Sequence, residues 1–170
     1  ASTFITTANN RSIILDQSGS VFTSTVTMQA GNGSNATFDN ITFVDSADVR
    51  LHSSAASAGD LYINASTDLA VGGNLSITAT TGDITQGGAL TITGTTTLVT
   101  IGQGATIDLT TDTNAFTSEL LITTNDNNTP ADSTYAAHAS IDGGTTNLII
   151  GTSTIDGNLS LLSGGTITDT

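Results

Sequence analysis

The chain has 170 residues, a formal net charge of −13 and no cysteine, and 36% of its residues are hydrophobic. Its only strongly basic residues are Arg11 and Arg50, against fifteen acids, which excludes the basic patches that bind nucleic acids or anionic membranes. Without cysteine, neither a disulfide framework nor a thiolate metal site can form.

Short apolar pairs separated by one residue recur along the chain, flanked by Gly, Asn, Asp or Thr. These pairs are Leu75/Ile77, Leu90/Ile92, Ile107/Leu109, Leu120/Ile122, Leu148/Ile150 and Leu159/Leu161. A period of two, with many β-branched residues, predicts β-strands. No window has the spacing of an amphipathic helix, so we predict an all-β chain.

Three stretches interrupt this pattern and are predicted to be loops. They are AGNGSN at 30–35, HSSAASAGD at 52–60 and NDNNTPADSTYAAHAS at 125–140. The third contains the only proline, Pro130, and few strand-forming residues. We predict that it protrudes from the body of the protein.

The chain also repeats itself. Residues 3–28 align with 97–122 at a constant shift of 94, which matches Ile13 with Ile107 and Phe22 with Phe116. The GNLS motif at 73–76 returns at 157–160, and the first copy is ten residues longer between its Phe and this motif. We therefore interpret 1–170 as a single segment of two imperfect repeats, 1–94 and 95–170, with the loop near 125–140 inserted.

Two folds fit these elements: a parallel β-solenoid and an antiparallel β-sandwich. Apolar strand starts at Leu75, Leu98 and Leu120 lie 23 and 22 residues apart, which is typical of a solenoid coil of about twenty residues. Stacked coils also explain the many Thr, Ser and Asn residues, whose side chains form ladders. The spacing therefore favours the solenoid, with the sandwich as the alternative.

The stretch GNLSITATTGDITQGGALTITGTTTL (73–98), followed by ATIDLTTDTNAFTSELLIT (105–123), resembles the repeats of filamentous-haemagglutinin-like giant surface proteins of Gram-negative bacteria. In such repeats a GNL start, an ITQ-GAL run and an Asn-Asp-Phe-Thr-like turn follow one another. Here 114–117 and 20–23 occupy that turn, without the acidic residue before Phe. The resemblance implies a right-handed parallel β-helix, export to the cell surface and a role as adhesin stalk or fibre. It carries over no catalytic residue.

The residues with potential chemistry are scattered. The histidines, His52 and His138, are interpreted as loop residues and not as a zinc site, which would need further ligands at short spacing. The closest carboxylates, Asp45/Asp48 and Asp126/Asp132, have no basic partner for polysaccharide cleavage. We therefore predict no catalytic, cofactor-binding or metal-binding residues and no enzymatic activity.

Calcium and glycans are the two kinds of ligand that the remaining polar residues could bind. Calcium could be held by NDNN at 125–128 or VDSAD at 44–48, but we favour Asx turns and solvated loops as the explanation of these residues and predict no required cofactor. Tyr62 and Tyr135 could contact a glycan. Asn-x-Ser/Thr triplets, potential glycosylation acceptors, begin at Asn10, Asn32, Asn35, Asn40, Asn64, Asn74, Asn127 and Asn158.

The pattern starts and stops without a polar capping unit, so we expect end-to-end self-association or continuation of the same chain. The sequence thus predicts a structural stalk or fibre segment of an extracellular bacterial adhesin. The alternatives are a binding module that recognises a glycan or protein through its loops and, less favoured, a β-helix carbohydrate-active enzyme. We expect neither nucleic-acid binding nor membrane insertion.

Overall fold

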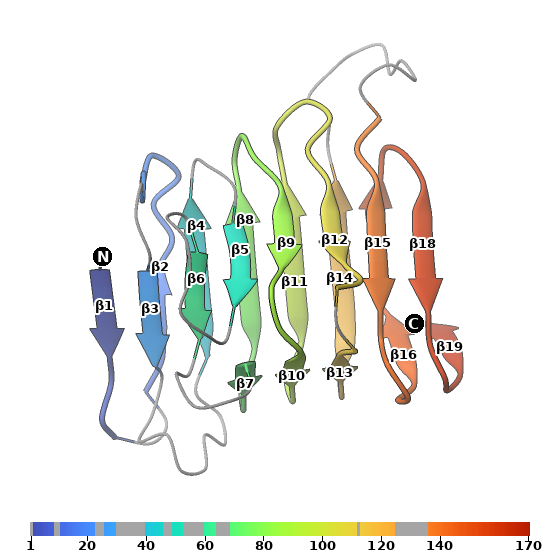
Figure 1. Ribbon diagram of the computed structural model, residues 1–170, viewed down its shortest axis with the longest axis horizontal. Coiled ribbons are helices and arrows are strands. Elements are labelled where there is room, and N and C mark those ends of the chain that lie inside the picture. Colours follow the sequence, from blue (N-terminus) through green and yellow to red (C-terminus); the bar gives the residue numbers. More distant parts are fainter. Residues whose placement is uncertain are drawn as a thin grey trace.

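The computed structural model describes residues 2–8, 11–22, 26–29, 40–45, 49–52, 60–63, 69–111, 113–124 and 136–170. Every regular element in this part of the chain is a β-strand, in agreement with the all-β prediction (Figure 1). The strands are two to six residues long and stand side by side in successive layers from the N-terminus to the C-terminus.

The strands form three sheets, which we name A, B and C. Sheet A has the order β1 (Ser2–Ile5), β3 (Val26–Gln29), β6 (Asp60–Ile63), β5 (Val49–His52), β9 (Ile84–Gln86), β12 (Ile107–Leu109), β15 (Ala139–Asp142) and β18 (Leu159–Leu162). Sheet B has the order β2 (Ile13–Leu15), β4 (Ile41–Asp45), β8 (Leu75–Ala79), β11 (Thr96–Thr100), β14 (Glu119–Thr124), β16 (Leu148–Ile150) and β19 (Ile167–Asp169), with β17 (Thr154–Ile155) also paired to β14. Sheet C is shorter and consists of β7 (Leu69–Val71), β10 (Leu90–Ile92) and β13 (Ala115–Phe116).

All strand pairings among the described residues are parallel, which excludes the antiparallel sandwich there. Leu75 pairs with Thr96 and Thr96 with Leu120, so one coil of chain takes 21 residues (96 − 75) and the next 24 (120 − 96). These lengths agree with the expected coil of about twenty residues. The chain passes from sheet A to sheet B and back, an arrangement compatible with a β-solenoid.

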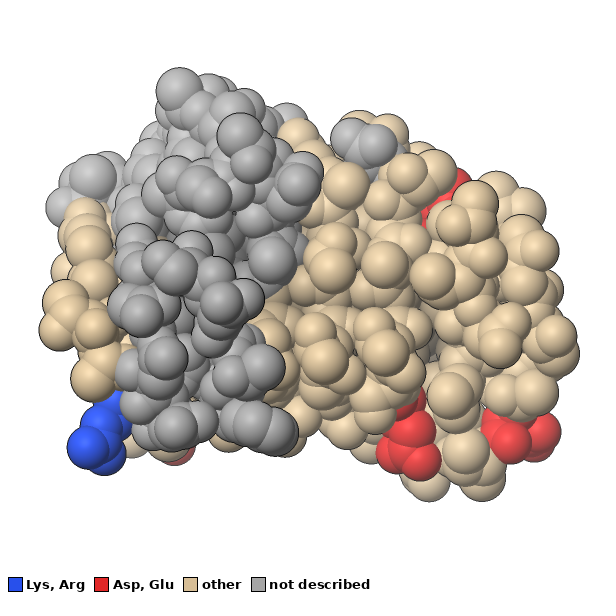
Figure 2. Space-filling model, turned by 90° about the horizontal axis from the view of Figure 1, so that it is seen from below, with Lys and Arg blue, Asp and Glu red and all other residues tan. Residues whose placement is uncertain are grey.

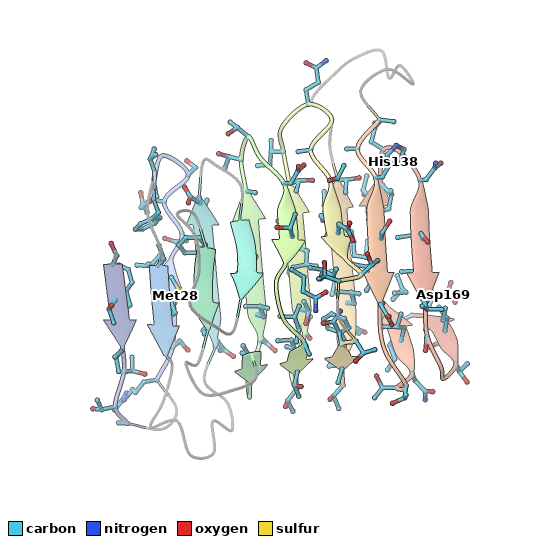
Figure 3. All side chains as sticks on the ribbon, in the orientation of Figure 1. Met28, His138 and Asp169 are labelled. Carbon is cyan, nitrogen blue, oxygen red and sulfur yellow. The ribbon has the colours of Figure 1, made fainter. Side chains whose placement is uncertain are left out.

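The core is a narrow apolar column between the sheets. Inward residues alternate with outward ones, as in β8 and β11. The parallel register places each inward residue next to an inward residue of the following coil. One such stack in sheet B is Phe43, Ile77, Leu98 and Ile122, all at most 2% exposed. Met28 of β3, labelled in Figure 3, is fully buried in the same core. Burying each such side chain stabilises the fold by roughly 1.5–3 kcal/mol.

The predicted apolar pairs all lie in strands: β8, β10, β12, β14, β16 and β18 contain them in chain order. The predicted loops need correction at their edges. Ala139 and Ser140, placed in the loop 125–140, belong to β15, because Ala139 and Ile141 face the core beside Ile107 and Leu109. Residues 125–135 and the loop 30–35 lie outside the described residues, as do 53–59 of the loop 52–60, whose end residues belong to β5 and β6.

The order of sheet A departs from chain order at one place. β6 lies between β3 and β5, and Arg50 pairs with Asp60, ten residues further along (60 − 50). Between its Phe and its GNLS motif, the first repeat contributes β3, β5 and β6 to sheet A, whereas the second repeat contributes β15 alone.

Candidate functional site

Polar side chains at the corners where the chain enters a strand bond to the next coil. We call the residue immediately before a strand of sheet A or B an entry residue. The entry residues considered below are Asn40, Asn74, Asp83, Thr95, Thr106, His138, Asn147, Asn158 and Thr166.

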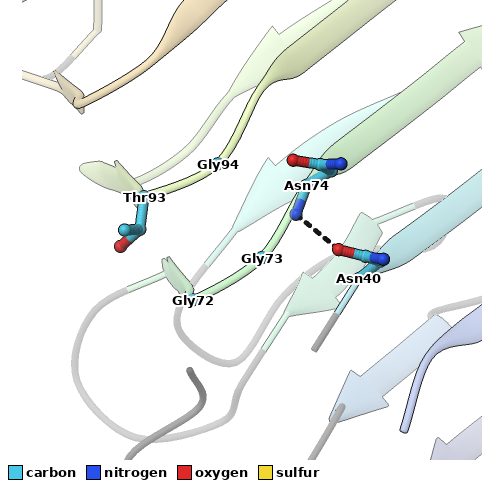
Figure 4. Close-up of a pocket in the computed structure, with 6 residues that line it drawn as sticks. All are labelled: Asn40, Gly72, Gly73, Asn74, Thr93 and Gly94. Carbon is cyan, nitrogen blue, oxygen red and sulfur yellow. Dashed lines mark hydrogen bonds between the residues drawn. The ribbon is translucent and has the colours of Figure 1, made fainter. Parts of the chain in front are cut away.

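Five entry residues use their side chains to hold the next coil. Each accepts a hydrogen bond from the backbone N–H of the entry residue one coil further on. The acceptor and donor pairs are Asn40 Oδ1 with Asn74 N (2.7 Å), Asn74 Oδ1 with Thr95 N (2.9 Å), Asp83 Oδ1 with Thr106 N (2.6 Å), His138 Nδ1 with Asn158 N (2.7 Å) and Asn147 Oδ1 with Thr166 N (2.9 Å). Figure 4 shows the first of these bonds.

A backbone bond runs in the opposite direction at each of these corners. The first N–H of a strand donates to the carbonyl of the next coil's entry residue, as from Leu75 to Thr95 at 3.0 Å and from Ala139 to Asn158 at 2.9 Å. Each corner thus satisfies both backbone groups of the incoming entry residue. Unpaired backbone groups are costly when buried, so this pairing stabilises the stack.

Glycine precedes several entry residues because the coils approach too closely for a side chain. A Cβ on Gly157 would lie 2.5 Å from His138 Nδ1, and one on Gly165 would lie 2.5 Å from Asn147 Oδ1. A Cβ on Gly94 would overlap Asn74 Oδ1 in the same way. This geometry explains the recurring Gly-Asn and Gly-Thr steps, including the GNL start of the repeat.

One corner opens into a shallow groove of about 400 Å3, drawn in Figure 4. Its walls are backbone and uncharged side chains, from Asn40, Gly72, Gly73, Asn74, Thr93 and Gly94. A second groove of about 240 Å3 is lined by Phe116, Thr117, Thr146, Asn147 and Ile149. Among the described residues, neither lining includes a titratable group.

A buried polar network inside the stack was not predicted. Asn114, 3% exposed, accepts bonds from Leu90 N and Gln86 Nε2, and donates to Leu109 O at 3.1 Å and to Asp142 O at 2.8 Å. One amide therefore joins three successive coils. The sequence places Asn114 in an ordinary-looking turn, and only its exact partners on neighbouring coils distinguish it from a surface Asn.

The residues considered for catalysis or metal binding are dispersed. Asp45 is buried and accepts a bond from Phe22 N at 3.1 Å, whereas Asp48, Asp126, Asp132 and Tyr135 lie outside the described residues. His52 and Tyr62 lie on the neighbouring strands β5 and β6, and the backbone alone is described there. In the part of the chain that is described, no three His, Cys, Asp or Glu side chains cluster as a metal site would require.

Charged side chains are few on the described surface that Figure 2 shows. On the face shown in Figure 2, the blue basic side chain lies at the N-terminal end, and red acidic side chains lie mainly toward the C-terminal end. Most of the remaining described surface there is uncharged. No helix in the described ranges could cross a bilayer.

The parallel sheets and the bonded corners define an all-β repeat protein in which each coil holds the next. Residues 58–123 match the model of a family described as repeats of unknown function (DUF5649). The matched span contains the corners at Asn74, Asp83, Thr95 and Thr106. No curated protein and no solved structure matches the chain.

Proposed function

We propose that this chain is a structural segment: a right-handed β-solenoid that forms part of the stalk or fibre of an extracellular bacterial adhesin. The observation that carries the proposal is the unbroken sequence of parallel pairings from β2 to β19 in sheet B. Right-handedness follows from the strong preference of parallel crossover connections. The cell-surface setting rests on the resemblance to filamentous-haemagglutinin-like repeats alone.

The hydrogen bonds between coils run along the axis of the stack. Strand pairings and corner bonds both join one coil to the next, so a force along the stack loads many bonds at once. The apolar stack between the sheets excludes water from the inner side of these bonds. Such a segment resists bending and proteolysis, and it has no need of a catalytic group.

The test is to lengthen the rod by whole coils. Three additional copies of residues 75–95, one coil by the register of β8 and β11, are inserted after Thr95. We expect retained β-structure and a maximum dimension about 14 Å longer at constant cross-section, since stacked strands are about 4.7–4.9 Å apart. Small-angle X-ray scattering measures both quantities.

The control insertion carries the same residues in scrambled order. It should disrupt the stack or emerge as an unstructured excursion, because its apolar pairs and corner residues no longer fall in register. If the insertion of three copies of residues 75–95 increased the cross-section of the molecule and not its length, the result would contradict a solenoid rod.

A further inference from the structure

The corners where the chain enters sheet B follow one another along the stack, and both grooves lie on them. The groove of about 400 Å3 takes its lining from three successive coils, at Asn40, at 72–74 and at 93–94. The groove of about 240 Å3 lies on the next two coils, at 116–117 and at 146–147. We call this line of two grooves the corner furrow. It covers five coils, or four strand spacings of about 4.7–4.9 Å each.

Each of these five coils contributes one polar side chain with unused hydrogen-bond donors. Asn40, Asn74 and Asn147 accept the N–H of the next coil at Oδ1, and each Nδ2 keeps two hydrogens that no hydrogen bond among the described residues uses. Thr93 and Thr117 are exposed, and their hydroxyls are likewise unused within the described part of the chain. The furrow therefore has one available donor side chain per coil.

The corner bonds fix the orientation of the amides before any ligand arrives. A carboxamide whose oxygen is bonded cannot turn without losing its contact with the next coil. Figure 4 shows the carboxamides of Asn40 and Asn74 one coil apart, with their nitrogen atoms on the same side. Donors that are held in place lose little conformational freedom on binding, and this preorganisation favours recognition of a ligand.

The chemistry of the furrow selects an uncharged ligand rich in hydroxyl groups. In the described lining no side chain is charged, and Phe116 is only 2% exposed, so the furrow offers neither an ion pair nor an open aromatic face. Glu119 pairs with Ile149 beside the smaller groove, and together with the net charge of −13 it repels anionic polymers. Amide and hydroxyl donors match the hydroxyl and ring oxygens of sugars.

We propose that the corner furrow binds an uncharged, extended oligosaccharide that lies along the stack with about one sugar per coil. The spacing between coils is close to the length of one sugar unit in an extended chain, so successive sugars meet successive donors. The larger groove has the size of a small-molecule site, about 300–1,000 Å3. This binding role is additional to the structural role and does not depend on it.

NMR titration of the isotope-labelled chain tests the proposal. The probes are cellopentaose and xylopentaose, which are uncharged and extended, pentagalacturonate, which is extended and acidic, and glucose. Because the furrow is shallow, we expect the uncharged pentamers to bind with a Kd of about 1 mM and to shift the backbone amides of Thr93, Gly94 and Thr117. Pentagalacturonate and glucose should bind at least tenfold more weakly.

Thr93→Arg places a long charged side chain in the larger groove and should abolish these shifts. The matched control is Thr91→Arg, since Thr91 is exposed two residues earlier on β10 and lies outside both linings, and its Kd should stay within twofold of the unmodified chain. Equal loss of binding in the two variants would overturn the proposal. So would equal binding of pentagalacturonate, or no shift with either uncharged pentamer in the unmodified chain, and these two results need no variant.

Discussion

At the scale of single residues, asparagines and glycines hold successive coils together. The side chain of an asparagine bonds to the neighbouring coil, and a glycine lets the two coils approach closely. Asn114 has the most bonds among them, with partners on the coil before, on its own coil and on the coil after. Burial makes these bonds consequential, because a buried polar group left without a partner costs about 1–3 kcal/mol.

We therefore expect Asn114→Ala to lower the free energy of unfolding by about 3 kcal/mol, since it leaves Leu90 N and Asp142 O without their partner. Denaturant titration followed by circular dichroism measures the loss. Asn158→Ala is the control, because its exposed side chain makes no hydrogen bond in the structure, and it should stay within about 0.5 kcal/mol of the unmodified chain. Equal effects of the two substitutions would contradict the role of the network.

At the scale of elements, the apolar pairs predicted the strands well because alternation directly reflects one face turned inward. The sheet to which a strand belongs could not be predicted in the same way. Ile13 and Ile107, matched by the shift of 94, lie in sheet B and sheet A respectively. Both sheets demand the same inward apolar pair, so the sequence does not distinguish them, and the division into 1–94 and 95–170 stays a prediction.

The corners illustrate the same limit. Asx turns were predicted only at 44–48 and 125–128, and the bonds at the corners were not predicted, because the partner of each side chain lies about one coil away in the chain, as with Asn74 and Thr95. His138 was interpreted as a loop residue, and its function as an acceptor became visible only with Asn158 beside it. The sequence shows that glycine precedes several corner residues. The reason, which is close contact with the neighbouring coil, could be recognised only once the strand register was known.

A prediction at this scale compares two glycines. Gly94→Ala places a methyl group against Asn74 and the backbone of Gly73, at 2.5 Å from its carbonyl oxygen, and should lower the free energy of unfolding by about 2 kcal/mol. Gly19→Ala meets nothing within 4 Å, and it should be neutral or stabilise by up to about 1 kcal/mol through the unfolded chain. Thermal unfolding of the two variants gives the comparison, and a stable Gly94→Ala would refute the close approach of the coils.

At the scale of the whole molecule, the two ends of the stack present apolar side chains at open strand edges. Ile5, Ile14 and Val21 are 53–62% exposed near the N-terminal end, and Leu159, Leu162 and Ile167 are 41–62% exposed near the C-terminal end. Open edges with exposed apolar residues favour pairing with another chain.

We accordingly expect the 170-residue chain to associate end to end, with a sedimentation coefficient that rises with protein concentration. Ile14→Lys combined with Leu162→Lys should abolish this rise and leave the unfolding temperature of the monomer within a few degrees, because both side chains are already more than 60% exposed. Thr123→Lys, on the half-buried outer face of β14, is the control for added charge alone. Association that survives the double substitution would place the contact elsewhere.

The three-coil reach of Asn114 also bears on how such a protein can change through recombination. Most corner bonds join only two consecutive coils. Duplicating or deleting one coil therefore leaves corner bonds of the same kind between the coils that become neighbours. Asn114 differs from these corners, because its hydrogen bonds require Gln86, Leu90 and Asp142 to be in place at the same time. A crossover between Gln86 and Asp142 keeps this network only when the coil placed next to Asn114 carries the same partners, as a duplicate of residues 75–95 does, so we expect fewer tolerated crossovers here than at corners that join two coils.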